Sequence, residues 1–356
     1  MKNSAILFIW DRIGDYHYAR IKACEKILDS SVYTADLAGT DALYKWNSID
    51  NNKHTVLSLK AVEQKDFFNR FRKFRSIIKE NKITAVAMPY GRLEYHTFLL
   101  YARFRGIRTI IFSESWYSRG RIKDFLKSIL LKFLGDYFFV SGVNAFNHFK
   151  NVYKINPDKI LKGYSVIDNN HFEIEDSAEK KHIICVARYS EEKNLLFLIR
   201  CFAKSTINKK YQLLLVGDGP QRMELQKLID QLNLNYRVTL TGWVSYEHLP
   251  VLYSSSVCAI LPSKFEPWGL VVNETMAAGL PILISNTCGC RPDLLEENKN
   301  GWSFDPYNEE GLINLFNTFS LLSQSEVEEM GMRSKSKINS FTPDIWSCNI
   351  LLFLQR

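Results

Sequence analysis

Short apolar runs alternate with amphipathic segments along the 356 residues of the chain. In the first half, apolar runs of strand length bounded by polar or turn residues predict buried strands. These are residues 5–10, 54–59, 83–88, 107–112 and 137–141. Segments with helical spacing of apolar residues lie between them, at 16–28, 62–80, 93–104 and 121–134. Such alternation predicts an α/β fold, with parallel sheets covered by helices.

The same alternation continues through the second half of the chain. Strands are expected at 183–187, 211–216, 238–241, 257–261 and 282–285, with helices from about Gln221, at 246–253 and at 270–278. We find no internal repeat, low-complexity tract or long linker. A chain of this length is too long for one ordinary core, so we predict two domains of about 150 to 180 residues each.

The stretch from Glu266 to Pro281 combines a tight turn, a helix start and two carboxylates. A Pro-Trp-Gly turn follows Glu266, and a helix is expected to begin near Gly269 and to end at Gly279. The first amides of a helix have no intrahelical partner and the dipole is positive there, so this start suits a diphosphate. Glu266 precedes the anion site, and Glu274 lies little more than a turn into the helix. Carboxylates on both sides of a phosphate site suit a nucleotide-sugar.

A second candidate site follows the strand at 183–187. Arg188 and Lys193 stand five residues apart on the loop between that strand and the next helix. Both can point at a diphosphate, the arginine through two donors and the lysine as a point charge. The alternative is that both side chains are only solvated.

Together these segments resemble the signature of glycosyltransferase family 4, whose members are retaining enzymes with the two-domain GT-B fold. That family has two glutamates separated by seven residues, as Glu266 and Glu274 are. The resemblance implies that Glu266 meets hydroxyls of the donor sugar and that Glu274 meets the nucleotide ribose. It also implies donor contacts from further residues: Arg188, Lys193, Gly269, Leu270, Val271 and, at the base, Trp243. Trp243 is equally interpreted as a packing residue.

The resemblance also implies a domain arrangement, a GT-B fold of two Rossmann-like domains facing across a cleft. Residues 168–172 resemble the family's interdomain linker, so we predict an acceptor-side domain at 1–167 and a nucleotide-sugar domain at 168–342. The last helix of GT-B enzymes commonly crosses back, which we expect of residues 343–356. The resemblance is strong over 181–301 and weak before that.

The N-terminal half matches the family least. It lacks the Gly-Gly loop after the first strand, but Gly14 is a candidate for contact with the donor phosphate. His17, or Asp15, is a candidate to face the acceptor, so we include His17 among the catalytic candidates. The alternative for His17 is a capping or solvated residue. His96 and Glu114 also follow strands, at the sheet edge where ligands bind.

Metal and disulfide signals are weak. Cys288 and Cys290 stand where the family has a Gly-Gly-x-Pro-Glu loop, and a lone Cys-x-Cys is a weak zinc signal. We find no Asp-x-Asp motif and expect neither a metal nor another cofactor. Seven cysteines, an odd number, favour a reducing compartment. No apolar run reaches signal-peptide or membrane-span length, so we expect a cytoplasmic protein, peripheral on the membrane.

Basic charge is concentrated in the first half. Residues 1–167 carry 28 Lys and Arg against 15 Asp and Glu, a balance of +13, whereas the remainder has 18 against 23, a balance of −5. Basic residues interleave with apolar ones in the helices at 62–80 and 121–134, from Arg70 to Lys79 and from Arg119 to Lys132. Such helices suit anionic lipid, unless their apolar stripes face the core. We find no module that combines aromatic stacking residues with a basic surface, so the sequence does not indicate nucleic-acid binding.

We therefore predict a retaining hexosyltransferase that moves a sugar from a nucleoside diphosphate, with UDP as the expected nucleotide, to a glycan or lipid-linked glycan. Cell-surface polysaccharide synthesis is the expected setting. Three alternatives stay open at this point: a GT-B nucleotide-sugar epimerase, a glycogen or sucrose-type synthase, and a non-catalytic nucleotide or glycan-binding protein.

Overall fold

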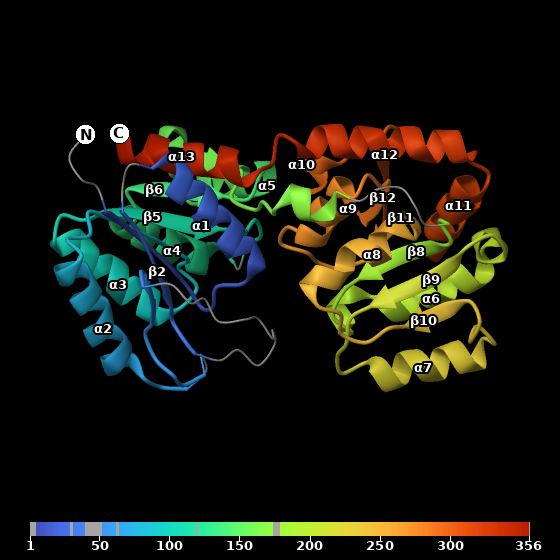
Figure 1. Cartoon of the computed structure of the whole chain (residues 1–356), viewed down its shortest axis with the longest axis horizontal. Helices are drawn as coiled ribbons and strands as arrows, with labels where there is room; N and C mark the ends of the chain where they lie inside the picture. The colour runs from blue at the N-terminus through green and yellow to red at the C-terminus, as the bar shows by residue number, and fades with distance from the viewer. Residues whose placement is uncertain are drawn as a thin grey trace. The chain divides into compact units, whose positions relative to one another are not determined.

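The computed structural model describes residues 5–28, 31–39, 52–61, 64–118, 120–173 and 179–355. The chain forms two compact units, each an α/β structure (Figure 1). The first unit contains Met1–Ile167 and Phe341–Arg356, and the second contains Asp168–Ser340.

The first unit is built on a seven-stranded sheet with the order β3-β2-β1-β4-β5-β6-β7, in which every described strand pair is parallel. The strands are β1 (Ala5–Trp10), β2 (Ser31–Asp36), β3 (His54–Val56), β4 (Ala85–Met88), β5 (Arg108–Ser113), β6 (Tyr137–Val140) and β7 (Ile160–Lys162). All residues of β1 and β4 are buried. Parallel strands covered on both faces need such continuous apolar runs, which is why these segments were recognisable from sequence.

Helices cover both faces of this sheet. They are α1 (Asp15–Ile27), α2 (Phe67–Glu80), α3 (Leu93–Phe104), α4 (Arg121–Leu134), α5 (Val143–Asn151) and α13 (Pro343–Gln355). One core cluster joins α2, α3, α4 and α5 to the sheet, and a second joins α1 and α13 to its other face. Trp346 of α13 is fully buried there, with its ring centroid 5.6 Å from that of Phe8 on β1. The last helix is therefore part of the core of the first unit.

One predicted strand of the first unit and the helix after it have bounds that differ by several residues from the structure. The strand expected at 54–59 ends at Val56, because the chain turns at Ser58. The Ser58 hydroxyl donates to the Asp66 carboxylate and accepts from the Lys60 amide. The following helix begins at Phe67 rather than at Val62, and Val62 lies outside the described residues.

The second unit has a six-stranded parallel sheet with the order β10-β9-β8-β11-β12-β13. Its strands are β8 (His182–Val186), β9 (Gln212–Val216), β10 (Val238–Leu240), β11 (Ser256–Leu261), β12 (Ile282–Ser285) and β13 (Gly301–Phe304). Its helices are α6 (Leu195–Lys204), α7 (Arg222–Gln231), α8 (Leu249–Ser254), α9 (Leu270–Ala277), α10 (Arg291–Leu294), α11 (Glu309–Ser320) and α12 (Gln324–Ile338). This strand order is that of a doubly wound nucleotide-binding sheet. Across the described residues, no helix has both the length and the apolar character needed to cross a membrane.

Candidate functional site

Three of the predicted donor residues lie on loops at the point where the strand order of the second sheet reverses. Strand β8 lies between β9 and β11, and the chain winds outward in opposite directions from this point. In doubly wound sheets ligands bind at the carboxyl ends of the strands at such a point. The loops that follow β8 and β11 carry Arg188, Lys193 and Glu266.

An ion pair joins the two loops. The Lys193 ammonium contacts the Glu266 carboxylate, which also accepts from the Ser263 hydroxyl at 3.3 Å. Lys264 adds a backbone link, because its amide donates to the Glu192 carbonyl at 2.8 Å. The side chains of Lys193 and Glu266 are 20% and 13% exposed, so water screens their charges less than at an open surface. Two residues that are 73 positions apart are thus held together in one place.

Helix α9 begins beside this pair. Gly269, its N-cap, has φ +98°, which favours glycine, and an added Cβ would lie 3.2 Å from Cγ of Glu266. The Val272 amide donates to the Gly269 carbonyl at 2.9 Å. Within the described part of the chain, no hydrogen bond is made by the amides of Leu270 and Val271. These two donors at the positive end of the helix are available to an anion.

The turn at 287–290 is hydrogen-bonded to the loop that carries Glu266. The Gly289 amide donates to the Glu266 carbonyl at 2.9 Å, and the Cys290 amide donates to the Trp268 carbonyl at 3.3 Å. Cys288 is buried and unbridged, and burial raises the pKa of its thiol to about 12. The two backbone hydrogen bonds of Gly289 and Cys290 tie this turn to the loop that carries Glu266. No group of three or more potential metal ligands occurs among the residues that the structure describes.

Glu274 and Trp243 occupy contrasting environments. Glu274 is completely buried, and its carboxylate accepts from the Tyr253 hydroxyl at 2.7 Å. Trp243 is 53% exposed on the loop after β10. The ribose role of Glu274 and the base role of Trp243 stay predictions, as does the diphosphate role of the exposed Arg188.

Gly217 and Gly219 permit a close approach between the loops that follow β8 and β9. A Cβ on Gly217 would lie 2.1 Å from the Ala187 carbonyl oxygen, and one on Gly219 would lie 2.5 Å from that of Tyr189. The Tyr189 amide donates to the Asp218 carbonyl at 2.9 Å. These glycines therefore hold the loop that carries Arg188 by close backbone packing.

In the first unit, Gly14 and His17 form the start of α1. Gly14 is the N-cap, and its amide donates to Nδ1 of His17 at 3.1 Å. The His17 ring lies 4.7 Å from the Trp10 ring. Burial, together with the nearby Arg20 guanidinium, holds the pKa of His17 well below its usual value, so the ring is neutral near pH 7. The capping role of His17 is real in this structure, and its role toward an acceptor stays a prediction, as does donor contact at Gly14.

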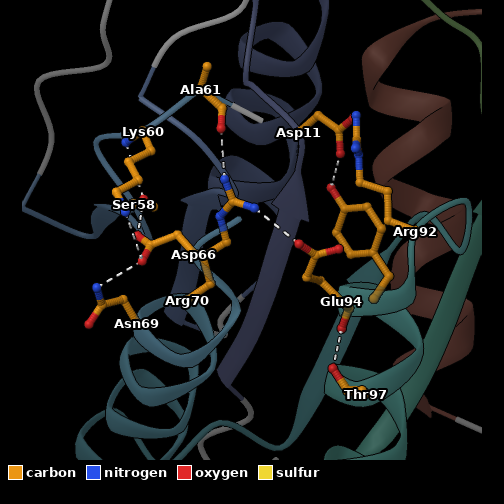
Figure 2. A network of polar contacts seen from close by, with 11 residues as sticks. Asp11, Ser58, Lys60, Ala61, Asp66, Asn69, Arg70, Arg92, Glu94 and Thr97 are labelled. Carbon is orange, nitrogen blue, oxygen red and sulfur yellow. Dashed lines mark hydrogen bonds and ion pairs between the residues drawn. The ribbon is translucent and has the colours of Figure 1, made fainter. Parts of the chain in front are cut away.

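A polar cluster that the sequence did not single out lies at the strand-order reversal of the first sheet, between β1 and β4. Asp11, directly after β1, accepts from Nε of Arg92 at 2.9 Å and from the Tyr95 hydroxyl at 2.6 Å (Figure 2). Arg92 and Tyr95 stand at the start of α3, after β4. Their positions after predicted strands were the only feature of the sequence that could have indicated this cluster.

Two candidates named from the sequence have other partners. His96 hydrogen-bonds the Tyr90 carbonyl, and Glu114 contacts Ser165.

Comparison with known proteins identifies the second unit. Residues 166–336 match the family model of glycosyl transferases group 1. These residues are thus similar to group 1 glycosyltransferases. Curated relatives are glycosyltransferases too: an uncharacterized glycosyltransferase of Methanocaldococcus jannaschii is 31% identical over 134 residues, 38% of this chain and 34% of the relative. The alpha-monoglucosyldiacylglycerol synthase of Acholeplasma laidlawii is 30% identical over 192 residues, 53% of this chain and 45% of that protein.

The fold likeness extends beyond residues 166–336. The Anabaena protein HepE, in complex with UDP, superposes with a TM-score of 0.78 at 15% identity over 99% of each chain. The chain spans between a third and a half of the length of these two curated relatives. The comparisons confirm the resemblance to family 4-type glycosyltransferases, a class of enzymes, and the GT-B fold.

Proposed function

We propose that the protein is a retaining glycosyltransferase that transfers a hexosyl group from a nucleoside diphosphate sugar to a hydroxyl of a glycan or lipid-linked glycan. The observation that carries this proposal is the Lys193–Glu266 pair beside the backbone amides that begin α9. The cation and the anion-binding helix start suit the diphosphate of such a donor, and the carboxylate suits the hydroxyls of its sugar.

The chemistry that this arrangement supplies is electrostatic. As the glycosidic bond breaks, negative charge grows on the leaving diphosphate, and we expect the amides of Leu270 and Val271, with Lys193 and Arg188, to stabilise it. Preorganised donors of this kind usually contribute more to catalysis than any other single effect. Glu266 accepts hydrogen bonds from the sugar hydroxyls and orients the sugar. The acceptor attacks on the face that the diphosphate leaves, and the leaving phosphate takes the acceptor proton.

The proposed identity of the two substrates rests on the known proteins that this chain resembles and on the polar cluster of the first unit. UDP is our proposed nucleotide, because a neighbour of the same fold was solved with UDP. The acceptor is proposed to meet the first unit at its strand-order reversal, where Asp11 and Arg92 offer a carboxylate and a guanidinium to hydroxyls or phosphates. One relative is named as a glycolipid synthase, which supports a lipid-linked acceptor.

The proposal is tested first by nucleotide binding. Calorimetry without added metal against UDP, GDP, ADP and CMP should show selective binding of one nucleoside diphosphate. Lys193→Gln should weaken that binding about tenfold, because it removes a charge-assisted contact. Lys204→Gln, which removes an exposed ammonium on α6 paired with Glu309, is the matched control and should leave it unchanged. No binding of any nucleotide would refute the proposal.

Turnover and stereochemistry complete the test. Glu266→Gln should lower kcat about a hundredfold with a smaller effect on nucleotide affinity, because the contact serves the sugar. The anomeric configuration of the product, read by NMR, should equal that of the donor. An inverted product would overturn the retaining mechanism, and conversion of the donor without any acceptor would identify an epimerase instead.

A further inference from the structure

Helix α4 buries two polar residues and leaves five large apolar residues exposed. Its buried residues are Asp124, Ser128, Leu131 and Leu134. Its exposed residues include Ile122, Phe125, Leu126, Ile129 and Phe133, which we call the apolar stripe and which are between 48% and 78% exposed. At 3.6 residues per turn these five positions fall within an arc of about 100°, opposite the buried residues.

The inward orientation is fixed by hydrogen bonds. The Ser128 hydroxyl donates to the Tyr153 carbonyl, and the Ser118 hydroxyl donates to the Asp124 carboxylate. Leu131 and Leu134 belong to the core of the first unit. Rotating the helix to bury the stripe would break these contacts, so the apolar stripe is a stable surface feature. A continuous exposed apolar face of this kind marks an interaction site.

Helix α2 shows that this exposure is specific to α4. Both helices have interleaved basic and apolar residues, and sequence alone treats them alike. In α2, however, Phe74, Ile77 and Ile78 are buried in the core, and even Arg70 is buried. For α2 the alternative left open by the sequence therefore holds, because these apolar residues pack in the core.

Basic side chains surround the apolar stripe. Arg121 and Lys132 flank it on one side and Lys123 on the other, all exposed. The one acidic residue within α4, Asp124, points inward. The exposed Arg103 and Arg105 end the neighbouring helix α3, and the Arg103 guanidinium lies 5.5 Å from the centre of the Phe133 ring. An apolar surface with a positive border complements a surface that is apolar inside and negative at its edge.

A basic hollow continues this surface at the end of α4. It has a volume of about 540 Å³ and is lined by Arg103, Arg108 and Lys159 against one carboxylate, that of Asp136. Because Arg103 both lines the hollow and stacks on Phe133, the hollow adjoins the apolar stripe. It offers room and cations for a negatively charged headgroup.

We propose that α4 docks this protein on an anionic lipid bilayer, with the apolar stripe inserted among the acyl chains and the flanking Lys and Arg residues at the headgroups. Basic residues that border an apolar face are the features that hold a helix in the plane of a membrane interface. The net charge of +13 over residues 1–167 adds longer-range attraction to such a surface. This surface is independent of the proposed sugar transfer.

Vesicle flotation of the whole chain tests the proposal. Wild type should float with phosphatidylcholine vesicles that contain phosphatidylglycerol, less with phosphatidylcholine alone, and less again at high salt. The triple variant Phe125→Ser, Leu126→Ser and Ile129→Ser should bind at least about tenfold more weakly, because apolar insertion is lost. The matched controls Phe68→Ser on α2 and Met223→Ser on α7, residues 86% and 80% exposed, should bind as wild type does.

A second variant separates charge from insertion. Replacing Arg121, Lys123 and Lys132 by Gln should remove the preference for phosphatidylglycerol, with about a fivefold loss of binding per residue. Wild type that fails to float, or a stripe variant that floats like wild type, overturns the proposal. If sedimentation instead shows a dimer that the stripe variant abolishes, the occupant is a second copy and the proposal also fails. Nucleotide affinity should be equal in all these variants, so the outcome is separable from that of the sugar-transfer test.

Discussion

At the scale of single residues, the donor site depends on backbone conformations that few side chains permit. Gly269 directs the chain from the Glu266 turn into α9 with a positive φ, and it packs against Leu261 and Glu266. Sequence reasoning could recognise this glycine because Gly at a helix start beside two glutamates is a local pattern. It could not recognise the contact of Lys193 with Glu266, since that contact requires knowing that β8 and β11 are neighbours.

Gly269→Ala tests the strained turn. The new Cβ would lie 3.0 Å from Leu261 and would force a residue with a side chain into φ near +98°. We expect a loss of about 2 to 3 kcal/mol in the free energy of unfolding, together with weaker nucleotide binding. Gly279→Ala is the control, because φ there is also positive but the Cβ meets open space, so about 1 kcal/mol is expected. Equal losses in urea denaturation would contradict the close-packing argument.

His17 should make stability depend on pH. Its pKa is lowered in the folded chain, so between the folded and unfolded values the folded state binds fewer protons. The free energy of unfolding should be unaffected above about pH 6.5 and should fall below it, by up to about 1.4 kcal/mol per pH unit. His17→Gln keeps an acceptor for the Gly14 amide but cannot titrate, so its stability should decline less on going from about pH 6.5 to 5.5. Parallel pH profiles of the two proteins in urea denaturation would exclude this effect.

At the scale of elements, the same sequence pattern produced two different helix orientations. Basic amphipathic character was visible in α2 and α4, but a helical wheel does not say which side meets the core. In α4, the hydrogen bonds of the buried Asp124 and Ser128 hold that face of the helix toward the core. In α2, the buried Arg70 marks the face that packs inward. Both depend on partners outside the helix itself, which is why the difference had to come from the structure.

The Arg70–Glu94 pair between α2 and α3 gives a test at this scale. Arg70 is fully buried, and its guanidinium donates to Glu94 at 3.0 Å and to the Ala61 carbonyl at 3.0 Å (Figure 2). Glu94→Gln leaves that buried charge without a carboxylate. We expect a loss of about 2 to 3 kcal/mol, at the low end for buried pairs because Glu94 is partly exposed. Glu329→Gln, in an exposed pair on α12, should cost less than about 0.5 kcal/mol, and equal losses would disprove the argument.

At the scale of the whole molecule, the alternation of strands and helices was enough to predict two parallel sheets, and the motif resemblance added the GT-B fold. The bounds of β1, α3, α4 and β12 agree with the sequence prediction, because each is a strongly apolar or strongly periodic segment. Strand β2 and helix α5 were missed. Ser31–Asp36 mixes polar with apolar residues, and Val143–Asn151 is short and rich in Asn, so neither stood out as a strand or a helix in the sequence.

Helix α13 has a consequence for how the protein is made. The face of the first sheet that holds Phe8, Phe112 and Phe139 is closed by Trp346, which the ribosome adds long after those strands. The second unit is continuous in sequence and can collapse as it leaves the exit tunnel, whereas the first unit, begun earlier, is finished later. We therefore expect the part of this aromatic surface that Trp346 covers to stay exposed on the nascent chain until α13 is made. Such a surface is a natural target for the chaperones that attend emerging polypeptides.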